Sequence, residues 1–187
     1  KAETLRLAKL AASLNGDDPL VLTVLGAAYS IINDHKSAKM LLERAVSLDP
    51  NSAWAWIRLG WTKCYCGLPE EAIEHFESAL RLSPYDPMNF NCFIGIGTAY
   101  EMARDFDNSI LYFERGLQEN PEAIWAYRQL VPAYMEVGRT EDAENGVRLL
   151  LQTYPSITAT RFREAMVLPD AEMDWICKNL VKAGLPE

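Results

Sequence analysis

Hydrophobic residues recur along most of the chain at the three- and four-residue spacing of amphipathic helices. In one stretch, Trp56, Leu59 and Gly60 stand at i, i+3 and i+4 and mark one face of a helix. The segment CGLPEEA (66–72) then interrupts the pattern. Its glycine suits the end of a helix, and its proline and glutamates suit the first turn of the next helix. The pattern therefore predicts two helices joined by a short turn.

The helix pair recurs along the chain. The position of Gly60 is filled in the other units by Gly26, Gly97 and Val131, so the successive steps are 34, 37 and 34 residues. The longer step arises in the segment SPYDPMN (83–89), where a second Asp-Pro adds residues before the next helix. Every unit also ends on a proline, namely Pro50, Pro84, Pro121 and Pro155. A fixed period of this length predicts a stack of helix pairs that bury their apolar faces against one another.

The order W-x2-L-G, then A-x3-F-x2-A, then P resembles the tetratricopeptide repeat. The residues that carry the resemblance best are Trp56, Leu59, Gly60, Ala72, Phe76, Ala79 and Pro84. It implies an all-α solenoid, a right-handed superhelix of about eleven helices in antiparallel pairs. Four units are expected at about 19–51, 52–86, 87–121 and 122–155. The second helix of an incomplete repeat (1–18) is expected before them, and capping helices (156–187) are expected after them.

In tetratricopeptide proteins, one stripe of the first helices lines a concave groove. In the second unit, Trp54, Arg58, Trp61 and Tyr65 share this stripe at i, i+4, i+7 and i+11, whereas Trp56 belongs to the core. Carried over to the later units, the groove also contains Asn91, Ile94, Thr98, Glu101, Trp125, Arg128, Gln129, Pro132 and Met135. Tryptophan and arginine are enriched at interaction hot spots, and neighbouring pairs form cation–π contacts. We interpret the stripe as a groove for a protein or peptide. The alternative is that its tryptophans pack on a neighbouring helix or on the chain's own C-terminal tail.

Charge and hydropathy exclude several classes of partner. The formal net charge of −8 argues against nucleic-acid binding, which needs clustered lysine and arginine. The longest apolar runs, such as LVLTVLGAAY (20–29), are shorter than a membrane span. The first residues alternate charged and apolar positions as a helix does, unlike a secretory signal. Because the chain begins with Lys1 and not with methionine, we expect it to be a fragment of a longer polypeptide.

The chain shows no motif of a catalytic, cofactor or metal site. Its four cysteines, Cys64, Cys66, Cys92 and Cys177, lack the spacing of a metal site or a disulfide framework. They are expected to be free thiols in a reducing compartment such as the cytoplasm. The two histidines, His35 and His75, have no nucleophile motif nearby. We therefore expect no enzyme activity from this chain.

A narrower resemblance comes from strings such as AWAWIRLGW (53–61), FERGLQENPEAIWAYRQLVPAY (113–134) and the terminal KAGLPE. They are similar to the carboxy-terminal repeats of certain bacterial signalling proteins. In these proteins, a class III adenylate/guanylate cyclase domain or a winged-helix DNA-binding domain precedes the repeats. The resemblance implies a regulatory module that binds a partner or its own effector domain. A homodimerisation scaffold for the effector domain is the alternative.

Overall fold

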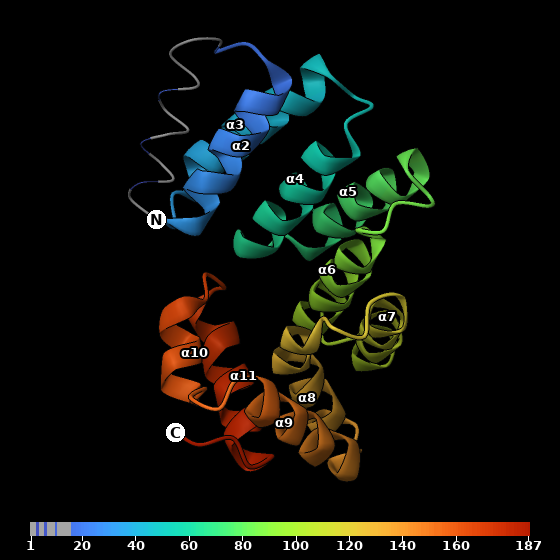
Figure 1. The fold of residues 1–187 in the computed structure, drawn as a ribbon, viewed down its shortest axis with the longest axis vertical. Helices are drawn as coiled ribbons and strands as arrows, with labels where there is room; N and C mark the ends of the chain where they lie inside the picture. Colours follow the sequence, from blue (N-terminus) through green and yellow to red (C-terminus); the bar gives the residue numbers. More distant parts are fainter. Residues whose placement is uncertain (1–2, 4–5, 7–9, 11–15) are drawn as a thin grey trace. The chain divides into compact units, whose positions relative to one another are not determined.

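The computed structural model describes residues 3, 6, 10 and 16–187 and divides the chain into two compact units, residues 1–86 and 87–187 (Figure 1). Within the described residues it contains ten α-helices, one 3-10 helix and no strand, so the all-α prediction is confirmed. The boundary between the units falls where the second and third predicted repeats meet. The helix expected within residues 1–18 lies largely outside the described residues.

The first unit consists of two helix pairs. Its helices are α2 (Pro19–Ile31), α3 (His35–Leu48), α4 (Ala53–Tyr65) and α5 (Pro69–Leu82). Helix α2 pairs with α3, α4 pairs with α5, and both helices of the first pair contact α4. Three of the four helices begin with a capping side chain, because Asp18, Asp34 and Ser52 accept hydrogen bonds from the amides of their first turns. Helix α5 instead begins with Pro69, which lacks the amide that would need a cap.

The second unit contains two further pairs and a C-terminal extension. Its elements are α6 (Asn89–Met102), α7 (Phe106–Glu119), the 3-10 helix η1 (Ile124–Ala126), α8 (Tyr127–Glu136), α9 (Thr140–Thr153), α10 (Ala159–Ala165) and α11 (Asp170–Lys182). Helix α6 pairs with α7, and α8 pairs with α9. Helices α10 and α11 pack on each other, and α11 also packs on α8. They stand where the two capping helices were expected.

The turn inside each repeat contains one residue in the left-handed region, with φ of 66° at Asn33, 72° at Gly67, 62° at Arg104 and 76° at Gly138. These positions are separated by the same steps as the repeats. In all four turns, the amide of the following residue donates to the carbonyl five residues earlier and closes the end of the first helix. Glycine and asparagine adopt this conformation readily, so Arg104 is the exception among the four.

The two helices of a repeat cross closely, because a small residue on the first helix faces a large one on the second. A Cβ atom placed on Gly60 would lie 2.9 Å from the ring of Phe76, and one on Gly97 would lie 3.0 Å from the ring of Phe113. Both phenylalanines are fully buried. The predicted small and aromatic positions therefore form the core of the second and third repeats.

The fourth repeat also has a close helix crossing, but here the larger residue is on the first helix and the glycine is on the second. Val131 takes the glycine position of the first helix, and Val147 takes the phenylalanine position of the second. Space for Val131 is made by Gly146, where a Cβ atom would lie 2.6 Å from the Cγ2 atom of Val131. Exchanges that conserve volume are the ones that packed cores tolerate best.

In each unit, a polar contact joins the two neighbouring repeats, and it uses the same repeat positions in both units. The Lys63 ammonium is almost fully buried and lies 3.2 Å from the Glu43 carboxylate of the preceding repeat and 2.6 Å from Glu71. Burial opposes the charge, but the hydrogen bonds that the ammonium donates to Glu71 and Glu43 outweigh it and raise the pKa of Lys63. In the second unit, Tyr134 occupies the lysine position and donates to Glu114 over 2.9 Å.

We expect Gly60→Ala to lower the free energy of unfolding by about 1–2 kcal/mol, measured by urea denaturation. Alanine favours a helix over glycine by about 1 kcal/mol, so a stabilising effect would be normal at an open helical position. Here the added methyl group overlaps the buried ring of Phe76, and the overpacking outweighs the gain in helix propensity.

Gly67→Asn is the matched control. Its position has open space around it and the same left-handed backbone as Asn33, so the expected change is within about 0.5 kcal/mol. If Gly60→Ala proved as stable as the wild type, the close crossing would not control the packing of the repeat.

Candidate functional site

Trp54 and Arg58 lie on the outward face of α4, as the repeat register predicts. The Trp54 side chain is 42% exposed, and Arg58 is half-buried. The Nε atom of Arg58 is buried and meets no hydrogen-bond partner within the described residues. A ligand carbonyl or carboxylate would supply the acceptor that this donor lacks.

Helix α2 extends this face with residues that sequence reasoning missed. Leu20, Val24 and Ile31 hold the repeat positions of Trp54, Arg58 and Tyr65. Each is a large hydrophobic residue that stays exposed, and α2 packs directly beside α4. The 34-residue step, applied backwards from the α4 stripe, would have found them. Together the two helices present an apolar face with Arg58 within it, which we call the α2–α4 face and define by Leu20, Val24, Ile31, Trp54 and Arg58.

The two other predicted residues of α4 turn toward neighbouring helices. Trp61 is buried, and its ring meets Phe76 edge-on with the ring centroids 5.6 Å apart. Tyr65 is half-buried, with its ring 5.8 Å from the ring of His35. Trp61 therefore packs in the core of its repeat, which is the alternative that its position left open.

In the second unit, Arg128 of α8 contacts both Trp125 of η1 and the C-terminal extension. Arg128 donates from Nε to the Trp125 carbonyl over 2.8 Å. Its guanidinium lies 5.7 Å from the centre of the Trp125 ring and 5.3 Å from that of Phe162 on α10. The predicted tryptophan–arginine pair thus forms, with a phenylalanine of the tail beside it.

The predicted residues of α6 are mostly buried. Ile94, Thr98 and Glu101 are fully buried, and Asn91 is half-buried. The amide of Gln129 on α8, also buried, donates to the Thr98 hydroxyl over 3.1 Å and joins the two first helices. Met135 of α8 is half-buried, and Pro132 is buried. The face that the register assigns to a groove is therefore not exposed in the second unit.

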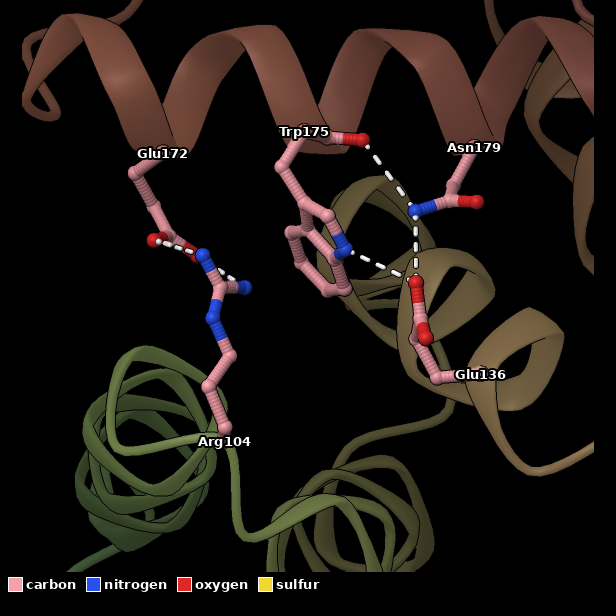
Figure 2. A network of polar contacts seen from close by, with 5 residues as sticks. All are labelled: Arg104, Glu136, Glu172, Trp175 and Asn179. Carbon is pink, nitrogen blue, oxygen red and sulfur yellow. Dashed lines mark hydrogen bonds and ion pairs between the residues drawn. The ribbon is translucent and has the colours of Figure 1, made fainter.

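Helix α11 packs on α8 and is bonded both to α8 and to the turn between α6 and α7, as Figure 2 shows. The Trp175 indole donates to Glu136 of α8 over 2.8 Å, and the Asn179 amide donates to the same oxygen over 3.2 Å. At the other end of the helix, Arg104 from the α6–α7 turn forms an ion pair with Glu172, with its two nitrogens 3.1 and 3.4 Å from the two carboxylate oxygens. The tail is thus held to both repeats of the unit.

The Arg104 guanidinium also stacks on the tail. It lies 4.4 Å from the centre of the Trp175 ring, and the Phe106 ring stacks on the same indole with centroids 5.6 Å apart. Arg104 therefore makes a cation–π contact and an ion pair with neighbouring turns of α11. The one sequence signal for this role is an arginine at the turn position where the other repeats have glycine or asparagine.

Glu101, three residues before Arg104, is a fully buried carboxyl group of α6. Neither of its oxygens accepts a hydrogen bond of ordinary geometry within the described residues, and the Gln129 amide is a weak donor nearby. Burial raises the pKa of Glu101 well above its usual value, and the nearby carboxylate of Glu172 acts in the same direction. Arg104 and the Gln129 amide oppose this shift without overcoming it. Burial also raises the pKa of Glu172. Burial and the charge of Glu172 therefore both favour the protonated form of Glu101.

The described residues form no metal cluster: no three His, Cys, Asp or Glu side chains are placed to hold an ion. All four cysteines are free thiols, and burial raises the pKa of Cys64. None of the helices described is long and apolar enough to span a bilayer. A pocket of about 200 Å³ lies between the start of α8 and α10 and is smaller than most small-molecule sites.

Comparison with known proteins agrees with this geometry. The tetratricopeptide repeat family matches residues 21–52 and 41–74. A solved repeat protein of Thermus thermophilus superposes with a TM-score of 0.72 at 19% identity, over 87% of this chain and 88% of that one. The chain has the tetratricopeptide repeat fold. YrrB, a repeat protein described as having an unusual peptide-binding site, superposes with a TM-score of 0.59 at 17% identity, over 95% of this chain and 92% of its own.

A curated relative is human superkiller complex protein 3, which is 25% identical over 99 residues, or 53% of this chain. The match spans 6% of the length of that protein. The tetratricopeptide prediction is thus confirmed for the fold, with family matches over residues 21–74. The narrower resemblance to cyclase-associated repeats stays a prediction.

We expect Glu101→Gln to stabilise the chain at neutral pH. Because its pKa is raised in the folded state, Glu101 holds its proton to a higher pH there than in the unfolded chain, where the pKa is 4.5, so the wild type loses stability as the pH rises from there. Glutamine cannot ionise and avoids this loss. Urea denaturation at pH 7.5 and pH 5 should show a higher free energy of unfolding for the variant at pH 7.5 and a smaller difference at pH 5.

Glu144→Gln, at an exposed site on α9, controls for the loss of one negative charge and should leave the pH dependence of the wild type in place. A Glu101→Gln curve parallel to that of the wild type would mean that the buried carboxyl ionises in the folded state.

Proposed function

We propose that this chain is a non-catalytic interaction module that binds a protein or peptide segment on the α2–α4 face. The observation that carries the proposal is the apolar strip of Leu20, Val24, Ile31 and Trp54, which stays exposed on two adjacent helices. Exposed apolar side chains gathered on one face mark interaction sites more often than isolated ones do. The tetratricopeptide fold and the peptide-binding site described for YrrB support the same function.

Arg58 indicates what the ligand carries besides apolar side chains. Its Nε donor is buried at the edge of the strip and lacks an acceptor within the described residues. A bound segment that places a carboxylate or a main-chain carbonyl there would remove this deficit. The ligand we propose is therefore an apolar segment with an acidic or carbonyl group opposite Arg58.

The finer assignment concerns the protein that contains the module. The resemblance of several sequence strings to bacterial signalling proteins supports a parent with a class III cyclase domain, and a winged-helix regulator is the alternative. The free thiols are compatible with a reducing, cytoplasmic setting. In such a parent, the module would regulate the effector domain by binding a partner or the domain itself.

Peptides selected on the immobilised chain from a displayed library test the α2–α4 face. We expect Val24→Ser and Trp54→Ser each to weaken the selected peptides by about tenfold, because burial of the apolar strip drives binding. Met40→Ser is the matched control, since Met40 is an exposed apolar residue of α3 in the same unit. Fluorescence anisotropy with labelled peptides gives the affinities.

Equal weakening by Met40→Ser would contradict a specific site on this face. Light scattering over a wide concentration range separates the homodimer alternative. A mass near 21.1 kDa throughout supports a face that is free for a ligand. A dimer that Trp54→Ser converts to a monomer would make the face a self-association surface.

A further inference from the structure

The pocket of about 200 Å³ between the start of α8 and α10 lies within the second unit and combines two kinds of wall. Phe162, Ile157 and Ala165 of the C-terminal extension give it apolar surface. Two arginines also line it, Arg128 from α8 and Arg161 from α10, and none of its lining residues within the described part of the chain is acidic. The pocket is therefore apolar and positively charged in a chain whose formal net charge is −8.

Arg161 provides a cation that the described residues do not neutralise. Its Nη1 atom donates to the Ser156 carbonyl over 2.8 Å, which orients the guanidinium. Arg161 takes part in no ion pair within the described residues, whereas Arg163 on the same helix pairs with Asp174. A guanidinium carries five N–H donors, so the bond to Ser156 leaves Arg161 able to bind a carboxylate as well.

Arg128 is held in place beside the apolar wall. Its Nε atom donates to the Trp125 carbonyl over 2.8 Å, and its guanidinium lies 5.3 Å from the centre of the Phe162 ring. Because these contacts already order the side chain, as the bond to Ser156 orders Arg161, little side-chain freedom is lost when a ligand binds. The positive charge at the pocket is thus preorganised.

We propose that this pocket binds a small apolar carboxylic acid, with its carboxylate at Arg161 and Arg128 and its apolar group against Phe162 and Ile157. Guanidinium matches the geometry of a carboxylate, and the apolar walls disfavour an inorganic anion, which would lose water there without compensation. The volume is below the range of drug-sized pockets and limits the ligand to about ten non-hydrogen atoms.

Such a ligand would connect the last repeat with the C-terminal extension. Arg128 belongs to α8, whereas Arg161 and Phe162 belong to α10, a helix of only seven residues. A ligand that contacts both elements binds only when they are docked, and it therefore stabilises the docked state. The pocket is an effector site at which a small acid tightens the extension on the repeats, and it does not depend on the α2–α4 face.

Phenylacetate is the probe, titrated into the full chain labelled with ¹⁵N and followed by amide chemical shifts. For a ligand of about ten non-hydrogen atoms we expect a dissociation constant of about 1 mM or lower, with the shifts concentrated at residues 154–165. Phenylacetamide has the ring without the charge and should bind about tenfold more weakly, as should acetate, which lacks the ring.

Each comparison can overturn one part of the proposal. Equal binding of phenylacetamide would contradict the role of the carboxylate, and equal binding of acetate would contradict the role of the apolar walls. Absence of shifts at residues 154–165 at millimolar phenylacetate would remove the site.

Variants on the surface of the second unit assign the binding to its residues. Arg161→Gln should weaken phenylacetate about tenfold through loss of a charged hydrogen bond, and Arg161→Lys should retain part of the affinity. Arg148→Gln is the matched control, since Arg148 is an exposed arginine of α9 that does not line the pocket. Equal weakening by Arg148→Gln, or none by Arg161→Gln, would overturn the site.

Hydrogen–deuterium exchange tests the connection between α8 and α10. With phenylacetate at ten times its dissociation constant, the amides of α10 should exchange about tenfold more slowly, with α2 to α5 unchanged. Unchanged exchange in α10 would overturn the effector role. Trp54→Ser should leave phenylacetate binding intact, because Trp54 belongs to the first unit, so this site and the α2–α4 face fail separately.

The end of a polypeptide offers the same chemistry as a free acid, and a peptide separates the two sources. Acetyl-glycyl-phenylalanine with a free C-terminal carboxylate should bind more weakly than phenylacetate, because the pocket is too small for the preceding residue. Tighter binding of the peptide would assign the pocket to a chain end and overturn the free acid as its ligand.

Discussion

The close crossing of the two helices in each repeat is the constraint on which the other features depend. It fixes which stripe of the first helix faces its partner, as with Gly60 against Phe76, and so which stripe faces away. The fourth repeat preserves the constraint with other residues, since Val131 is accommodated by Gly146. Because every repeat has this crossing, residues such as Leu20 and Trp54 occupy equivalent places on the outward stripe of their helices.

The repeat architecture was predictable because its determinants are local and periodic. The spacing of Gly60, Ala72 and Phe76 depends on contacts inside one helix pair, and the turn at Gly67 depends on a single backbone conformation. A family match over residues 21–74 and the superposed solved structures agree with a register that the sequence alone indicates.

The candidate site was less predictable because its exposure depends on non-local packing. Trp61 and Glu101 lie on the predicted stripe, yet Trp61 packs on Phe76 and Glu101 is fully buried. Nothing periodic relates α11 to the repeats, so the bond from Trp175 to Glu136 has no counterpart at the repeat spacing. The exposed residues of α2 could have been predicted from the repeat register by counting 34 residues back from the stripe of α4.

The same stripe thus has opposite fates in the two units, and the difference is chemical as well as steric. In the first unit its residues Leu20, Val24, Ile31 and Trp54 are apolar and exposed, and Arg58 has a donor that lacks an acceptor within the described residues. In the second it is covered, with a carboxyl group that accepts no hydrogen bond of ordinary geometry there. A permanent cap needs neither a left-handed arginine at position 104 nor a carboxyl group at position 101, because glycine and an apolar residue would serve better there. The strained backbone of Arg104 falls at the contact between α11 and the repeats, where the ion pair with Glu172 and the stack on Trp175 hold it.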